Sequence, residues 1–355
     1  MGIKKAIKAV VKYGLPLAIS IGLCYYLFTS SNMKWSDIVE GLRTYNMWWI
    51  ALAMFISIFS HFFRAMRWRI QLREIDVNVP LSSLVNSIFG TYAINLVFPR
   101  LGEVWRCGYI ANRSKKPFSN VFGSMVADRL ADTATVLVLL ILALFLAFGA
   151  IKQYLVNVNA YDSFVGILSS PWLWIGFAVF VGLIVWLFAG KSKNKFVTKI
   201  RETVKGLWDG FAAIGRMKGK WKWLGLTVAI WGCYFTQLYV AFFATSFVTD
   251  SGEIFNFACP SGVVTAFVVF VCSSIAMGVP ANGGIGPWQW AVILAMGIYG
   301  MHEGTGVFAN IVLGTQTLLL IVLGIYTAIA ITFEKKLVAP AGDPPTAPDK
   351  NIGDN

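Results

Sequence analysis

The stretch Asn95-Leu-Val-Phe-Pro99-Arg100-Leu-Gly102-Glu103-Val-Trp-Arg106 decides how this chain folds, because it places charged residues at the end of an apolar segment. The 23 residues before its first charge, 77–99, carry no formal charge. Charged side chains in hydrocarbon are expensive and usually functional, so this stretch is the first candidate for a functional site. Pro99 and Gly102 also predict a break in the helix at this point.

The composition is that of an integral membrane protein. Hydrophobic residues make up 57% of the 355 residues, charged residues only 13%, and the mean hydropathy is +0.66. A helix needs about 20 apolar residues to cross the hydrocarbon core. Uncharged runs of this order occupy 13–33, 44–63, 133–150, 172–189, 223–248, 254–301 and 304–333. They predict an all-α polytopic membrane helix bundle with about seven to nine membrane segments.

Charge and rare residues argue against several other classes. The net charge of +13 comes from Lys and Arg beside the apolar runs, where the positive-inside rule expects them, so we predict no nucleic-acid partner. Five cysteines without paired spacing and two distant histidines, His61 and His302, suggest neither disulfides nor a metal centre. We therefore expect no metal and no cofactor.

The basic residues also predict an orientation in the inner (cytoplasmic) cell membrane. Four lysines before residue 13 place the N-terminus in the cytoplasm, and 13–33 is interpreted as an uncleaved span because no small-x-small cleavage site follows it. The segment 191–222 has ten Lys and Arg and an apolar stripe at helical spacing, so it lies on the inner leaflet or binds a partner. We expect a membrane domain over 1–338 and a disordered cytoplasmic tail over 339–355.

Two segments are predicted to be broken helices. A full crossing of 81–98 would put five basic residues between positions 100 and 116 on the outer face, whereas a re-entrant hairpin that turns at 99–102 avoids this conflict. The 48-residue run 254–301 is interrupted at 279–287 and is either two full spans or a second hairpin entered from outside. Two hairpins entered from opposite sides would indicate an inverted repeat with a binding site between them.

The first break carries the strongest site candidates. Helical spacing places Arg100, Glu103 and Arg106 on one face, and Asn95 lies just before them. Two arginines around one carboxylate leave a net positive site, and the planar guanidinium fork suits phosphate oxygens. An anionic lipid headgroup is therefore the expected guest, and a structural ion pair that holds the hairpin is the alternative.

A second group of charges precedes the run that begins at residue 133. Asp128 and Asp132 are four residues apart and share a helix face, with Arg129 between them. They either neutralise the arginines of the first break or form a solvated helix start. The three arginines within 64–69 fit an anchor at the inner leaflet better than a substrate contact.

The second break is rich in glycine. Gly283, Gly284 and Gly286 let the backbone expose amide groups that bind an anion, or they form a simple tight turn. Asn282 and Gln289 bring polar side chains to the same depth. We include all five residues among the candidate substrate contacts.

In this order the motifs resemble the lysylphosphatidylglycerol synthase transmembrane-domain family, the membrane half of the multiple peptide resistance factor. The resemblance rests on Arg67-Trp68, Asn95...Pro99-Arg100-x-Gly102-Glu103-x-x-Arg106, Asp128-Arg129-x-x-Asp132, the basic loop and Pro280-x-Asn282-Gly283-Gly284-Ile-Gly286, and it covers residues 10–335. The family usually has Glu at positions 128 and 289; Asp128 keeps that charge, whereas Gln289 loses it and with it any proton role.

The resemblance implies a polytopic protein that moves a polar lipid between leaflets. In the full-length synthase a cytoplasmic aminoacyl-transferase domain supplies the lipid, and we do not expect that domain in the 17-residue tail. Membrane lipids are the expected partners, and a separate lipid-synthesising enzyme and a homo-oligomer remain open.

Three functions compete at this point. The leading hypothesis is a lipid flippase or carrier, not an enzyme, in which Arg100 and Arg106, balanced by Glu103, hold a phosphate-bearing headgroup. A small-solute or ion transporter would instead use Glu103, Asp128 and Asp132 for coupling. A membrane-embedded transferase acting on lipid-linked sugars or phosphates would use Glu103 or Asp128 as a base, although no His or Cys constellation accompanies them.

Overall fold

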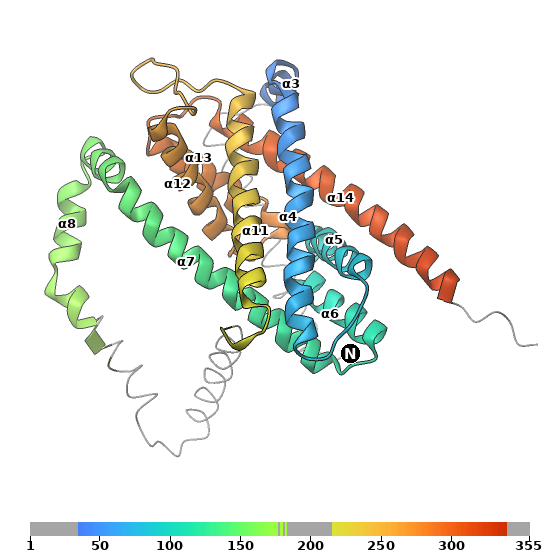
Figure 1. The fold of residues 1–355 in the computed structure, drawn as a ribbon. Coiled ribbons are helices and arrows are strands. Elements are labelled where there is room, and N and C mark those ends of the chain that lie inside the picture. Colours follow the sequence, from blue (N-terminus) through green and yellow to red (C-terminus); the bar gives the residue numbers. More distant parts are fainter. Residues whose placement is uncertain (1–34, 177, 180–181, 183–214, 339–355) are drawn as a thin grey trace, which may run out of the picture.

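The computed structural model describes residues 35–176, 178–179, 182 and 215–338, and within these ranges the chain is helical without a named strand. Four helices are long and apolar enough to cross a membrane: α4 (Met47–Arg73), α7 (Phe118–Asn157), α11 (Lys220–Ala241, continued by the short η2, Phe242–Ala244) and α14 (Thr305–Val338). The predicted all-α polytopic bundle is confirmed (Figure 1).

The first predicted break is present. The helices α5 (Leu81–Val97) and α6 (Leu101–Ser114) pack against each other and are joined by three residues, Phe98, Pro99 and Arg100. Arg100 has a φ of 63°, a left-handed conformation that reverses the chain and that a non-glycine residue rarely adopts. At 1.5 Å per residue, these helices are only about 25 and 21 Å long, which is short for a full crossing of about 30 Å.

The second break divides the run 254–301 into α12 (Pro260–Ala276) and α13 (Pro287–Gly297), with the 3₁₀ turn η3 (Asn282–Gly284) between them. Gly283, Gly284 and Gly286 all have positive φ, which explains why the turn needs glycine. The 11 residues of α13 span about 16 Å, half of the hydrocarbon core. The structure therefore favours a hairpin over two full spans.

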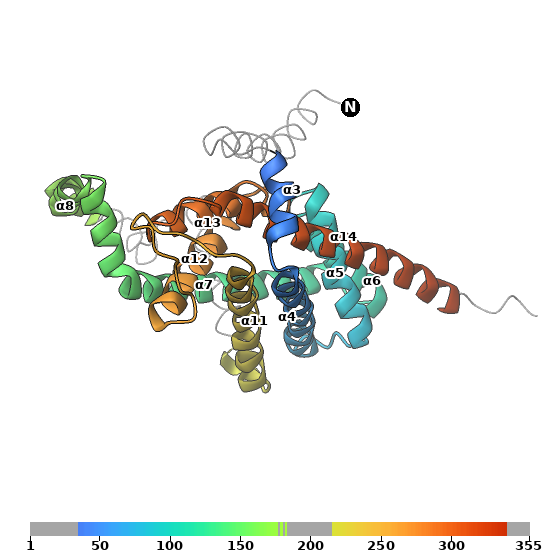
Figure 2. The same ribbon diagram turned by 90° about the horizontal axis from the view of Figure 1, so that it is seen from above.

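The element order repeats. A long helix, two short helices and a long helix follow each other in α4–α5–α6–α7 and again in α11–α12–α13–α14. The contacts are reciprocal, because α4 packs on α11, α5 packs on α14 and α12 packs on α7. The paired helices α4 and α11 lie side by side and run in opposite directions (Figures 1 and 2). This arrangement is that of an inverted repeat.

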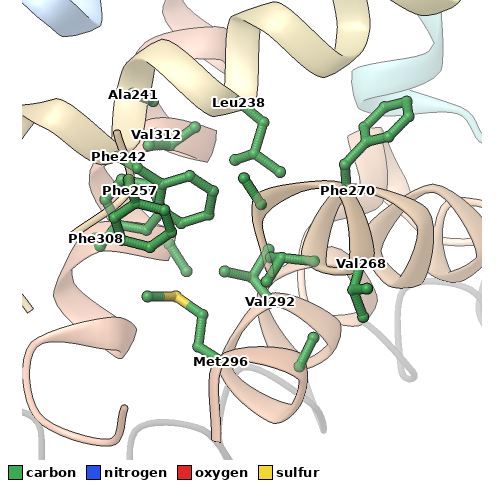
Figure 3. Packing of buried hydrophobic residues seen from close by; sticks show 14 of the residues in the cluster. Leu238, Ala241, Phe242, Phe257, Val268, Phe270, Val292, Met296, Phe308 and Val312 are labelled. Atoms are coloured by element: carbon green, nitrogen blue, oxygen red, sulfur yellow. The ribbon is translucent and has the colours of Figure 1, made fainter. Parts of the chain in front are cut away.

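The second half of the chain builds the main apolar core. Phe242 stacks on Phe257 with ring centroids 4.3 Å apart and on Phe308 with centroids 5.0 Å apart. Leu238, Val292 and Met296 fill the space beside these rings (Figure 3). The buried charged side chains of the described residues, Arg64, Arg67, Arg106, Asp128 and Asp132, lie instead on α4, α6 and α7.

Several expectations are adjusted or lie outside the described residues. Two short helices, α3 (Trp35–Thr44) and α8 (Tyr161–Ser169), lie between the predicted uncharged runs, and α11 begins at Lys220, inside the basic segment 191–222. The predicted span 13–33, the tail 339–355 and most of 172–189 and 191–222 lie outside the described residues.

Candidate functional site

Seven charged side chains from three helices meet between α4, α6 and α7, and we call them the arginine–carboxylate cluster: Arg64, Arg67, Glu103, Arg106, Asp128, Arg129 and Asp132. Its two α4 members lie six and nine residues before the end of that helix, about 9 and 14 Å from it. Four arginines thus face three carboxylates inside the bundle, which leaves one excess positive charge.

The centre of the cluster is a set of ion pairs between side chains that are at most 12% exposed. Arg67 Nη2 lies 2.6 Å from Asp128 Oδ1 and 2.7 Å from Asp132 Oδ1, and Arg64 Nη1 lies 2.7 Å from Asp132 Oδ2. Arg64 also donates to the hydroxyl of Tyr234 on α11, at 3.3 Å from Nη2. The two aspartates are four residues apart on α7 and the two arginines three apart on α4, so each pair lies on one helix face and the two faces carry opposite charges where they pack.

Glu103 has a different partner from the one we expected. Its Oε1 lies 2.8 Å from Arg129 Nη2, and Asn95 Nδ2 donates to its Oε2 at 3.2 Å. Asn95 also accepts a hydrogen bond from the Gly102 amide at 2.9 Å, which ties the two arms of the hairpin together. The prediction that Glu103 pairs with Arg100 or Arg106 is wrong, because Arg129 from the next helix reaches it first.

Arg106 is the arginine of the cluster with the fewest hydrogen bonds. Its side chain is fully buried, its guanidinium carbon lies 4.5 Å from the ring centroid of Trp68, and its Nη2 is 3.9 Å from Asp128 Oδ2. None of its three guanidinium nitrogens has a hydrogen-bond partner among the described residues. The aromatic face offsets part of the desolvation cost of the cation. The hydrogen-bonding capacity of this guanidinium is therefore unused among the described residues.

Arg100 lies apart from the cluster, at the point where the two hairpins touch. Its Nη2 donates to the Gly278 carbonyl oxygen at 2.8 Å, and Asn282 Nδ2 donates to the Val97 carbonyl oxygen at 3.2 Å. Arg100 is exposed, whereas Arg106 is buried. The predicted pair of arginines around one carboxylate is therefore not formed, and the turns of both hairpins meet instead.

The residues of the second break have structural partners. Gln289 is 5% exposed; its Oε1 accepts from the Gly286 amide at 2.8 Å, and its Nε2 donates to Asn310 Oδ1 at 2.6 Å. Gly283 faces the Leu96 side chain of the first hairpin, and its φ of 59° is the left-handed conformation that favours glycine. That Asn282, Gly283, Gly284, Gly286 and Gln289 contact a substrate stays a prediction.

Sequence reasoning missed Arg64 and Arg67. We expected an anchor at the inner leaflet, but these side chains are 3% and 0% exposed, and the helix continues past them to Arg73. Asp128 and Asp132 likewise lie inside α7, ten and fourteen residues after its first residue, so the expected solvated helix start is wrong. The sequence does contain a signal for this contact. The pair Arg64 and Arg67 and the pair Asp128 and Asp132 each have helical spacing and carry opposite charges, so they neutralise each other if the two helices pack together.

The chemistry of the arginine–carboxylate cluster suits the binding of a phosphate group. Burying charges costs several kcal/mol per ion unless they are paired, so a surplus guanidinium inside a membrane protein marks a functional site by default. Arginine forks bind phosphate oxygens in bidentate fashion. Among the described residues, no three His, Cys, Asp or Glu side chains are grouped so that they could hold a metal ion.

Comparison with known proteins gives one match. The family model described as the lysylphosphatidylglycerol synthase TM region matches residues 15–324, which is most of the chain and includes both hairpins and the whole arginine–carboxylate cluster. No curated protein matches the chain.

Proposed function

This chain belongs to the lysylphosphatidylglycerol synthase TM-region family, and from this membership and the geometry of the site we propose that it moves a phosphate-bearing lipid between the two leaflets. The family supports a lipid-related membrane function, as the sequence motifs implied. The observation that carries the proposal is the buried, hydrogen-bond-deficient guanidinium of Arg106 in a cluster with one excess positive charge. This charge matches one phosphodiester.

The architecture supports transport rather than a static scaffold. Two helical hairpins meet at Arg100 and Asn282, and the helices around them form an inverted repeat. Interrupted helices at a repeat interface commonly form substrate sites in transporters. In the proposed cycle the headgroup exchanges ion pairs with Arg106 and Arg129, while the acyl chains stay in the bilayer.

The competing ion transporter has less support from the same contacts. Coupling by carboxylates needs a group that binds and releases a cation or proton, but Asp128, Asp132 and Glu103 are each held within 2.8 Å of an arginine nitrogen. We further propose that the protein acts without catalysing a reaction, that it lies in the inner membrane and that both chain ends face the cytoplasm.

A reconstitution assay tests the proposal. The protein is incorporated into liposomes that contain a fluorescent phosphatidylglycerol labelled on an acyl chain, and dithionite bleaches the outer leaflet. We expect the wild type to expose inner-leaflet probe to bleaching and Arg106→Gln to lose this activity. Lys116→Gln, at an exposed position just after the end of α6, serves as the matched control and should behave as wild type. Equal transfer by wild type and Arg106→Gln would refute the proposal.

A further inference from the structure

The helix α4 turns its polar side chains inward and its apolar side chains outward, the reverse of a surface helix in a water-soluble protein. Six polar side chains recur at spacings of three and four along its buried face, and each is at most 5% exposed: Ser57, Ser60, His61, Arg64, Arg67 and Gln71. Large apolar side chains, among them Trp48, Phe55 and Phe59, are exposed on the other side. From Ser57 to Gln71 the polar face covers about 21 Å, two thirds of a hydrocarbon core of about 30 Å.

Some of these polar groups are satisfied inside the bundle. Ser60 Oγ donates to the Ser57 carbonyl oxygen at 2.6 Å, and Ser57 Oγ accepts from Gln316 Nε2 of α14 at 3.0 Å. Gln316 in turn accepts from Gln237 Nε2 of α11 at 2.9 Å. These bonds explain why the serines are tolerated in the interior.

Two other side chains on the same face are not satisfied. Neither imidazole nitrogen of His61 and neither amide atom of the Gln71 side chain has a hydrogen-bond partner among the described residues, although the two residues are 3% and 5% exposed. Buried polar groups are nearly always paired, and leaving them unpaired costs stability. Two such side chains on one face therefore call for a functional explanation.

The two unsatisfied side chains lie on opposite sides of the ion pairs. The His61 ring packs on the Tyr92 ring with centroids 4.4 Å apart, and the Tyr92 hydroxyl lies 3.5 Å from that of Tyr234, which Arg64 contacts. Gln71 follows Arg67 by four residues, one helical turn. About 15 Å of helix separates His61 from Gln71, with the arginines between them.

We propose that the buried face of α4 is the route of the lipid headgroup through the protein, with His61 and Gln71 as hydrogen-bonding positions before and after the arginine–carboxylate cluster. This proposal rests on the proposed function and adds the path and the substrate class. A neutral imidazole and a carboxamide each offer a donor and an acceptor, whereas the arginines offer only donors. The fitting headgroup therefore combines a phosphodiester with hydroxyl or ammonium groups that donate hydrogen bonds.

Isosteric apolar variants test the route with the same liposome assay. His61→Phe keeps an aromatic ring beside Tyr92, and Gln71→Leu keeps the volume of the side chain. Each should lower the initial rate of phosphatidylglycerol transfer about tenfold, as expected for the loss of one hydrogen bond during passage. Because each removes an unsatisfied buried group, the thermal midpoint should stay the same or rise. Ser274→Ala on α12, away from the α4 face, removes a hydroxyl already bonded to the Phe270 carbonyl oxygen of its own helix and should transfer at the wild-type rate.

The outcomes separate this proposal from the proposed function. If the wild type transfers no lipid, both fail. If the wild type transfers lipid and Arg106→Gln does not, but His61→Phe or Gln71→Leu transfers at the wild-type rate, the function stands and the continuous route is refuted. A loss of transfer that accompanies a lower thermal midpoint would assign the two residues a structural role and also overturn the route. Phosphatidylcholine, which has no hydrogen-bond donor, should move more slowly than phosphatidylglycerol; equal rates would contradict the assigned substrate class.

Discussion

The charge balance of the cluster makes a quantitative prediction for Asp128→Asn. Asp128 is fully buried, and its carboxylate oxygens lie 2.6 Å from Arg67, 3.5 Å from Arg64 and 3.9 Å from Arg106. Neutralising it raises the excess from one to two buried positive charges. Two charges 4 Å apart interact by about 4 kcal/mol at an effective dielectric constant of 20. This value agrees with the 3–5 kcal/mol or so that is lost when one partner of a buried ion pair is removed.

The assay is thermal unfolding of the purified protein in detergent, followed by tryptophan fluorescence. Asp128→Asn should lower the midpoint by roughly 10 °C, at about 2–4 °C per kcal/mol. Arg67→Gln leaves three arginines facing three carboxylates, so this variant should lose less thermal stability than Asp128→Asn. The double variant restores the wild-type excess of one and should recover most of the stability that Asp128→Asn loses. An Asp128→Asn protein no less stable than Arg67→Gln, or a double variant with the summed losses of both, would refute this reasoning.

Three further predictions address the hairpins and the core. A methyl group at Gly102 would collide with the Thr91 carbonyl oxygen, so Gly102→Ala should cost about 1–3 kcal/mol in the unfolding assay, whereas Gly108→Ala, with open space around it, should not destabilise the protein. Hydrogen bonds from the Ser261 hydroxyl and the Gly262 amide hold the pKa of Cys259 below its ordinary value. Its alkylation by a membrane-impermeant maleimide should therefore begin at a lower pH than that of a free thiol. In intact cells the maleimide added outside should label Cys259, and protection from labelling would reverse our proposed orientation. Gln316→Leu leaves Gln237 unpaired and should cost about 1 kcal/mol, part of which the double Leu variant recovers.

The sequence was sufficient to predict the membrane bundle and the first hairpin. Pro99, Gly102 and the basic residues after them are local signals, and each acts on the backbone within a few residues. The sequence did not decide whether 254–301 forms two full spans or a hairpin, because charge counting gives no information inside an uncharged run. The 11-residue length of α13 resolves it.

The site was less predictable because its contacts are non-local. Uncharged runs end at Phe63 and begin at Thr133, so we placed helix ends there, but both helices continue with their charges buried. Arg64 meets Asp132 across 68 residues, a pairing that no local spacing reveals. Glu103 was paired with its neighbours three residues away, whereas the hairpin turns it towards Arg129 on α7.

The lipids that copurify with the protein test the central claim most directly. If the surplus guanidinium of Arg106 holds a phosphate-bearing headgroup, mass spectrometry of wild-type protein purified in mild detergent should show anionic phospholipids enriched over their share in the membrane. Arg106→Gln, purified in parallel, should lose that enrichment, while Lys116→Gln keeps it. The same lipid composition in wild type and Arg106→Gln would contradict the assignment of Arg106 as the headgroup site.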